Sequence, residues 1–115
     1  MILEPKLSVR FYKTLTGREP VRGWLWSLGK VLTKEIGSDI QAVQWRWPVS
    51  LPLVDSFGKG LYEVRTRFQG NIYRVLFCVQ EGEMVLLHGF MKKTLKTPKD
   101  DLDLARKRQK EVKKS

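Results

Sequence analysis

The chain has 115 residues, of which 42% are hydrophobic and 30% charged, a composition typical of a globular protein. Its length fits one domain over residues 1–115 and is too short for a second core. Its 22 Lys and Arg residues against 12 Asp and Glu give a formal net charge of +10, so we expect a nucleic acid or an acidic protein as partner. No apolar run approaches the roughly 18 residues that cross a bilayer, and the N-terminus lacks a signal-peptide pattern, which argues against secretion or a membrane partner and favours a cytoplasmic location.

The first half of the chain predicts a strand followed by two helices. Apolar and polar residues alternate over Lys6–Thr14, as in a strand that could join a sheet at its edge. Pro20 suits the first position of a helix that ends near Gly29, and helical spacing of apolar residues predicts a second helix over Thr33–Trp45. We expect this helical hairpin to cover one side of a sheet. The segment Trp47–Gly60 is rich in turn formers and is interpreted as a connecting loop.

Five side chains of the helical and strand regions could have a functional role, but a role in packing is the commoner one for each. Trp24, Trp26, Trp45 and Trp47 could stack on exposed bases, but core or partner contacts are the commoner use of tryptophan. Cys78 is the only cysteine and lies in a hydrophobic stretch, so we expect a small buried core residue rather than a reactive thiol. A single thiol cannot form an intramolecular disulfide, which fits a reducing compartment.

The strongest pattern of the chain is the stretch Leu61–Thr97. It is rich in β-branched and aromatic residues and predicts three antiparallel strands. Two tight turns separate them, one at Gln69-Gly70 and one at Glu81-Gly82. The remaining elements are expected to pack around this sheet.

A two-residue loop at the first turn fixes the pairing of the first two strands. It places Arg65 directly opposite Arg74, with Glu63 on the same face of the sheet. Like charges that face each other destabilise a sheet, so the pair requires solvent or an anion between the guanidinium groups. An anionic ligand is the sharper explanation, and neutralisation by Glu63 is the simpler one.

The second turn leaves two registers open. A two-residue loop pairs His88 with Val75, whereas a three-residue loop that includes Glu83 pairs His88 with Leu76. We favour the three-residue loop, because it brings His88 and Phe90 to the arginine side of the sheet. That register leaves six strand residues for the core: Tyr73, Val75, Phe77, Val79, Val85 and Leu87.

The C-terminal segment predicts a helix that starts at Pro98. Asp100, Asp101 and Asp103 fall in its first turns, and its basic residues lie toward the end, which suits the helix dipole. A solvated helix end is the commoner role of such a basic tail, although it also adds to the positive field of the molecule.

The candidate chemistry of the chain is carried by cations and one histidine. No Cys/His cluster, phosphate loop or nucleotide-binding glycine pattern is present, so we expect neither a metal nor a cofactor. Cations that hold a phosphate, together with a proton-transferring side chain, suit RNA cleavage. The candidate catalytic residues are Arg65, Arg74, His88, Lys92 and Lys93, and the candidate RNA-binding residues are Arg67, Lys96 and Glu63. Either His88 or a lysine of the 92–93 pair could serve as general acid or base. A structural histidine and a solvated basic loop are the alternatives.

The residues LLHGFMKKTLKTPKDDLDLA, preceded by LYEVR and YRVLF, resemble the HigB-like branch of the RelE/ParE superfamily of bacterial and phage toxins. TGREPVRGWL and DIQAVQWRWP in the first half look like the same family, so the resemblance spans nearly the whole chain. It implies an α+β RelE-like fold, with an N-terminal strand and a two-helix hairpin on a small antiparallel sheet and a helix at the C-terminus.

The resemblance also implies a function. It points to the toxin of a type II toxin-antitoxin pair, a metal-independent endoribonuclease that cuts mRNA on the ribosome and is silenced by a helix-turn-helix antitoxin. Arg65, Arg74, His88, Lys92 and Lys93 match positions where that family carries basic and candidate catalytic groups. Catalytic residues vary across the superfamily, and its ParE branch inhibits DNA gyrase without nuclease activity. A gyrase inhibitor is therefore the second hypothesis, and a plain nucleic-acid-binding domain the third.

Overall fold

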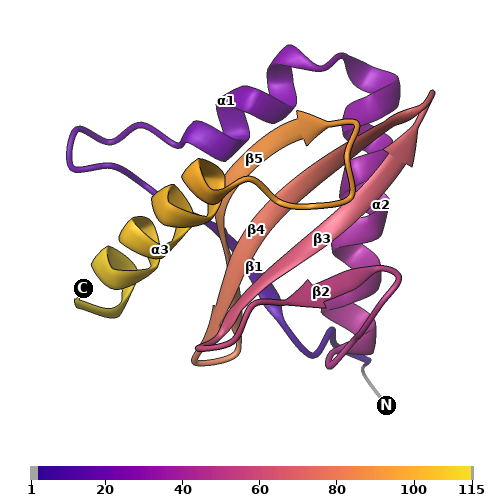
Figure 1. Ribbon diagram of the computed structural model, residues 1–115. Helices are drawn as coiled ribbons and strands as arrows, with labels where there is room; N and C mark the ends of the chain where they lie inside the picture. The colour runs from indigo at the N-terminus through magenta and orange to yellow at the C-terminus, as the bar shows by residue number, and fades with distance from the viewer. Residues whose placement is uncertain (1–2, 115) are drawn as a thin grey trace.

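The computed structural model describes residues 3–114, and within them the chain forms three helices and a five-stranded sheet (Figure 1). In chain order the elements are β1 (Ser8–Phe11), α1 (Pro20–Ser27), α2 (Lys30–Arg46), β2 (Val54–Ser56), β3 (Leu61–Phe68), β4 (Asn71–Gln80), β5 (Glu83–Lys92) and α3 (Lys99–Lys114). The predicted α+β architecture is confirmed. The strand order is β1-β5-β4-β3-β2, and the sheet is mixed because β1 joins the edge of β5 in parallel.

Helices cover both faces of the sheet (Figure 1). The face toward α1 and α2 carries the larger cluster of buried side chains, which we call the α1–α2 core; it includes Val21, Ile36, Val43, Val75, Phe77 and Leu86. The opposite face carries the α3 core, which includes Leu61, Leu76, Cys78, Val85, Leu87 and Ala105. The two-helix hairpin therefore covers one side, as expected, and the C-terminal helix covers part of the other.

The helical hairpin turns at a single glycine. Pro20 occupies the first turn of α1, where its missing N–H is not needed. Gly29 has a φ of 87°, a conformation that glycine adopts without steric cost, and it directly precedes α2. The second helix therefore begins at Lys30 rather than at the predicted Thr33.

Both hairpins of the sheet use two-residue turns with positive φ. The angles are 49° and 81° at Gln69 and Gly70, and 51° and 76° at Glu81 and Gly82, which is the pattern of tight turns that match the twist of the strands. The predicted pairing of β3 with β4 is confirmed along its whole length. The predicted three-residue loop between β4 and β5 is wrong, because Gln80 pairs directly with Glu83.

A β-bulge at Leu87 nevertheless produces the predicted register around the histidine. Phe77 pairs with Leu86 and Leu76 pairs with His88, so Leu87 is an extra residue on β5. Leu87 and His88 both contact the α3 side of the sheet, Leu87 in the α3 core and His88 through Asp101. The bulge therefore brings His88 to the same face as the two arginines.

Three other expectations need correction. The segment Trp47–Gly60 is not only a loop, since β2 pairs with β3 at the edge of the sheet. Val85 and Leu87 are buried, but in the α3 core, because the two-residue turn pairs Val85 with Cys78 and the bulge adds Leu87 to the same side. Tyr73 and Val79 are only partly buried.

Candidate nucleic-acid interface

One face of the sheet gathers the candidate residues. Strands β3, β4 and β5 run side by side, and directly opposite residues share a face. We call this face, on the α3 side of the sheet, the arginine face; it carries Glu63, Arg65, Arg67, Arg74, His88 and Lys92. Lys93 and Lys96 follow in the segment 93–97, which connects β5 to α3 on the same side (Figure 1).

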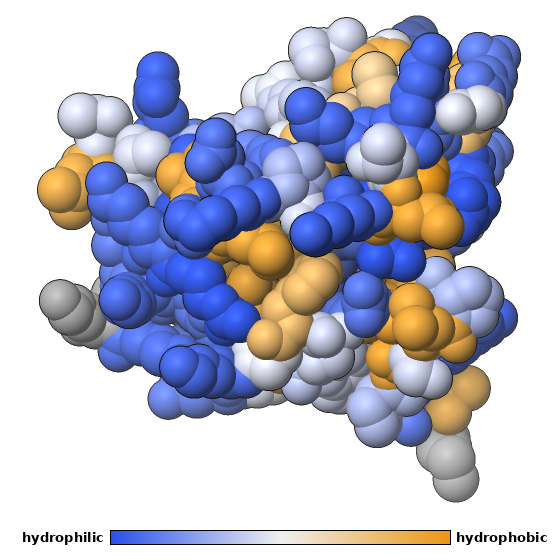
Figure 2. All heavy atoms as spheres, in the orientation of Figure 1, coloured by the Kyte–Doolittle hydropathy of each residue, from blue (hydrophilic) through white to orange (hydrophobic). Residues whose placement is uncertain are grey.

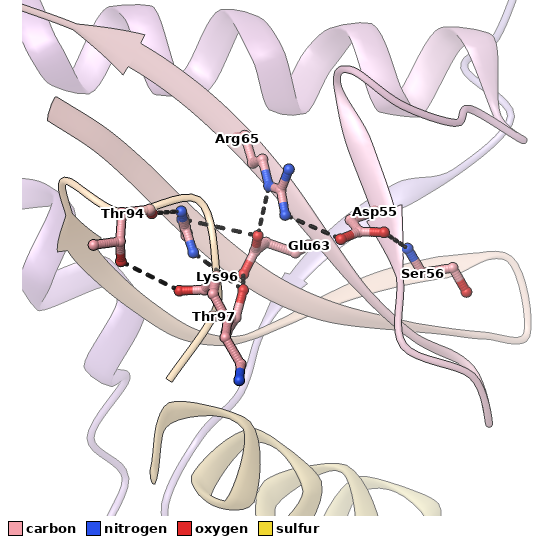
Figure 3. A network of polar contacts seen from close by, with 8 residues as sticks. Asp55, Ser56, Glu63, Arg65, Thr94, Lys96 and Thr97 are labelled. Atoms are coloured by element: carbon pink, nitrogen blue, oxygen red, sulfur yellow. Dashed lines mark hydrogen bonds and ion pairs between the residues drawn. The ribbon is translucent and has the colours of Figure 1, made fainter. Parts of the chain in front are cut away.

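The cross-strand arginine pair is neutralised from within the chain (Figure 3). Glu63 Oε1 accepts a hydrogen bond from Arg65 Nε at 2.8 Å and lies 3.9 Å from Arg74 Nε. Asp55 Oδ2, on β2, lies 3.0 Å from a terminal nitrogen of Arg65. Two carboxylates thus face two guanidinium groups, and the anion that the like-charged pair requires is provided by the protein.

Arg74 is fully buried and fixes the path of the segment 93–97. Its terminal nitrogens donate to the Thr94 carbonyl and, at 3.2 Å, to Thr97 Oγ1. Thr97 Oγ1 in turn donates to Glu63 Oε2 at 2.6 Å. Burial lowers the pKa of the Arg74 guanidinium, and the nearby Glu63 carboxylate opposes that shift. Arg74 therefore acts on the segment that carries Lys93 and Lys96 and has no surface of its own.

The remaining cations of this region are available to a ligand. Arg67, Lys92, Lys93 and Lys96 are exposed, and none of them forms an ion pair within residues 3–114. Arg67 and Lys92 both lie opposite Ile72 of β4, so their backbones are about 10 Å apart across three strands and their long side chains can converge on one phosphate. Hydrophilic side chains cover much of this side of the molecule, with hydrophobic patches between them (Figure 2).

His88 lies apart from these exposed cations. Its Nε2 is 2.7 Å from Asp101 Oδ1 in the first turn of α3, and its ring stacks on Phe90 with a centroid distance of 5.3 Å. Lys92 lies four positions further along β5, which corresponds to about 13 Å. The structure thus brings Arg65 and Arg74 together, gathers the lysines with Arg67, and gives His88 a separate carboxylate partner.

Asp55, Asp101 and Thr97 are residues of this region that the sequence did not identify. Asp101 falls among three acidic residues of a helix start, which have a sufficient explanation in the helix dipole. Only the packing of α3 against β5 shows that one of them meets the histidine. Thr97 carried no signal, because its role depends on the fold of the segment over Arg74.

Within residues 3–114, neither a membrane-spanning helix nor a metal-binding cluster is found. Residues 3–114 contain no helix that is both long and apolar enough to cross a membrane. The same residues contain no group of three His, Cys, Asp or Glu side chains placed to hold a metal ion.

Comparison with known proteins places the chain in a family. The model of the family described as phage-derived protein Gp49-like (DUF891) matches residues 23–110, which is most of the chain and includes the whole arginine face. No curated protein matches the chain. The chain therefore belongs to the Gp49-like family of phage-derived proteins, a family of RelE/ParE-like toxins of toxin-antitoxin systems.

Proposed function

We propose that this chain is the toxin of a type II toxin-antitoxin pair and that it cuts mRNA on the ribosome in the cytoplasm. Membership of the family implies an antitoxin partner, which we expect to be a helix-turn-helix protein encoded beside the toxin. The observation that supports RNA as the target is the group of exposed, unpaired cations at one end of the arginine face: Arg67, Lys92, Lys93 and Lys96.

In this proposal the exposed cations bind the RNA backbone and stabilise the charge that develops during cleavage. A general base takes the proton of the ribose 2′-hydroxyl, and the 2′-oxygen attacks the adjacent phosphorus. The bond between phosphorus and the 5′-oxygen breaks, and a general acid donates a proton to the leaving 5′-oxygen. We propose that Lys92 and Arg67, which both lie opposite Ile72, contact the phosphate, with Arg65, 14% of whose side chain is exposed, on the same face. Arg74 is a positioning residue for Lys93 and Lys96 rather than a phosphate ligand.

Two groups remain candidates for proton transfer. The imidazole of His88 can accept or donate a proton through a ring nitrogen, and the contact of its Nε2 with Asp101 Oδ1 at 2.7 Å fixes the orientation of the ring. A lysine of the 92–93 pair lies closer than His88 to the proposed phosphate site, since Lys92 and Arg67 both lie opposite Ile72. The His88→Ala and Lys92→Ala variants separate them, because the variant that lacks the base loses the corresponding limb of the pH–rate profile.

Induced expression in bacteria tests the function. Primer extension on abundant transcripts should show cuts within translated regions, and Lys92→Ala/Lys93→Ala should abolish them. Lys107→Ala/Lys110→Ala is the matched control, since both lysines are exposed on α3. Intact transcripts together with inhibited gyrase supercoiling would support the ParE-like alternative instead, and neither effect would leave a basic binding domain.

A further inference from the structure

The side of the molecule opposite the arginine face carries a hollow that the proposed toxin activity does not use. It has a volume of about 600 Å³ and lies between α1, the start of α2 and the end of β1. Its walls include Phe11, Leu25, Trp26 and Thr33. Thr33 Oγ1 donates to the Leu25 carbonyl at 2.6 Å, which ties the start of α2 to α1 beside the hollow.

Trp26 stands at the centre of this surface. It is 79% exposed, although α1 is an eight-residue helix that contacts the sheet. A second hollow of about 560 Å³, lined by residues 18–20, 22, 23 and 26, adjoins the first and shares Arg22 and Trp26 with it. An exposed tryptophan between two hollows is the kind of aromatic anchor that concentrates binding energy in protein interfaces.

The charges around the two hollows have one dominant sign. Four basic side chains line them against one acidic side chain, namely Arg18, Arg22, Lys30 and Lys34 against Glu19. Arg22 pairs with Glu19 at 3.2 Å and lies over the Phe11 ring. Lys30 and Lys34 are exposed and have no ion-pair partner in the described part of the chain. The two hollows together form one groove, which we call the α1–α2 groove. It is apolar inside and positively charged at its rim.

We infer that this α1–α2 groove binds an acidic segment of the cognate antitoxin, which inserts apolar side chains around Trp26 and places carboxylates against Lys30 and Lys34. Complementary charge at the rim steers such a partner and fixes its register. A second copy of this chain fits poorly, because a two-fold interface would bring the same cationic rim against itself. The inference rests on the toxin-antitoxin function and does not depend on nuclease activity.

The groove and the arginine face lie on opposite sides of the sheet, separated by the α1–α2 core. Substitutions in the groove should therefore weaken antitoxin binding without changing the toxicity of the free chain. This separation distinguishes the groove from an RNA-binding surface, on which loss of Trp26 would remove a stacking platform and reduce toxicity.

Titration calorimetry of the full-length chain with its full-length cognate antitoxin tests the inference. Trp26→Ala and, separately, Lys30→Glu/Lys34→Glu should each weaken binding by about 30-fold or more. Trp45→Ala and Lys107→Glu/Lys110→Glu are the matched controls, because these residues are exposed and do not line the groove. The charge variant changes only exposed residues, so it keeps the test valid if Trp26→Ala unfolds.

The outcomes separate the inference from its rivals. Weaker binding by both groove variants, with control variants and toxicity unchanged, supports it. Unchanged antitoxin affinity in Lys30→Glu/Lys34→Glu overturns it, as does a loss of toxicity at full antitoxin affinity or a dimer that Trp26→Ala dissociates. If the unsubstituted chain itself fails to bind the antitoxin, the toxin-antitoxin function fails with it, whereas the absence of RNA cleavage leaves this result untouched.

Discussion

At the scale of single residues, the most constrained group is the Glu63 carboxylate. It is fully buried, and it accepts hydrogen bonds from Arg65 and Thr97 while Arg74 lies 3.9 Å away. A buried carboxylate is stable only when cations and donors surround it, and the cations here need it equally. Glu63 therefore connects the sheet to the segment that carries the lysines.

Replacing Glu63 by Gln should lower the free energy of unfolding by about 3 kcal/mol, because the buried Arg74 guanidinium loses its counter-charge and Arg65 loses one of its two carboxylate partners. Urea unfolding measures the effect. Glu35→Gln is the control, since Glu35 is exposed on α2 and forms no ion pair with a described residue. A loss for Glu63→Gln no larger than that of the control would mean that Asp55 alone neutralises the arginines.

A second prediction about a single residue concerns the thiol of Cys78. It is 98% buried in the α3 core, and desolvation raises the pKa of its thiol. The folded chain therefore keeps this proton when the unfolded chain loses it, and the associated stability is complete below the unfolded pKa of about 8.5 and decreases as pH rises above it. The difference in unfolding free energy between the natural chain and Cys78→Ala should shrink as the pH rises above about 8.5. A difference in unfolding free energy that does not change with pH would contradict a raised pKa of the Cys78 thiol in the folded chain.

At the scale of elements, α1 packs on β5 through a glycine. A Cβ at Gly89 would lie 2.3 Å from the Trp24 ring, so the helix approaches the strand only because that side chain is absent. Trp24 in turn contacts Tyr73 at a centroid distance of 6.4 Å. The position of α1, and with it the groove around Trp26, depends on this contact.

Gly89→Ala should lower the unfolding free energy by about 1–3 kcal/mol, because the indole must move and α1 must tilt. Gly37→Ala is the matched control: Gly37 lies inside α2 with open space around its Cα, and alanine should stabilise the helix there by about 0.5–1 kcal/mol. Thermal unfolding of both variants provides the test. Equal shifts in the two variants would show that Trp24 adapts without cost.

The strand pairings show which features of the fold the sequence could predict. The pairing of Arg65 with Arg74 followed from the Gln69-Gly70 turn, because a two-residue loop determines every pair beyond it. The β5 register was right for His88 but came from a bulge at Leu87, which local sequence does not signal.

The buried state of Glu63 and Arg74 escaped prediction for a tertiary reason. It requires the segment 93–97 to fold over the sheet, where Thr97 and the Thr94 carbonyl complete the hydrogen bonds. The contact between His88 and Asp101 likewise depends on where α3 docks. Helix and strand patterns locate the elements, whereas these contacts arise between elements distant in the sequence.

At the scale of the whole molecule, the net charge of +10 is distributed over two surfaces of different character. On the arginine face the free cations surround buried ion pairs, and in the α1–α2 groove they surround apolar walls.

Binding of single-stranded RNA should weaken with salt, and each lysine removed from the 92–93 pair should reduce the slope of log affinity against log salt by about 0.7. Fluorescence anisotropy with a labelled oligonucleotide measures this slope, and an unchanged slope would place the RNA elsewhere.

The most direct test of the account is cleavage of an end-labelled mRNA by the purified chain, with and without translating ribosomes. We expect cuts only when ribosomes are present, and we expect Lys92→Ala/Lys93→Ala to slow them by about 100-fold or more, because the transition state loses its charge stabilisation. Lys107→Ala/Lys110→Ala should cut at the rate of the natural chain. Equal rates for the two double variants, or no cleavage in any condition, would contradict an RNA-cleaving role for the arginine face.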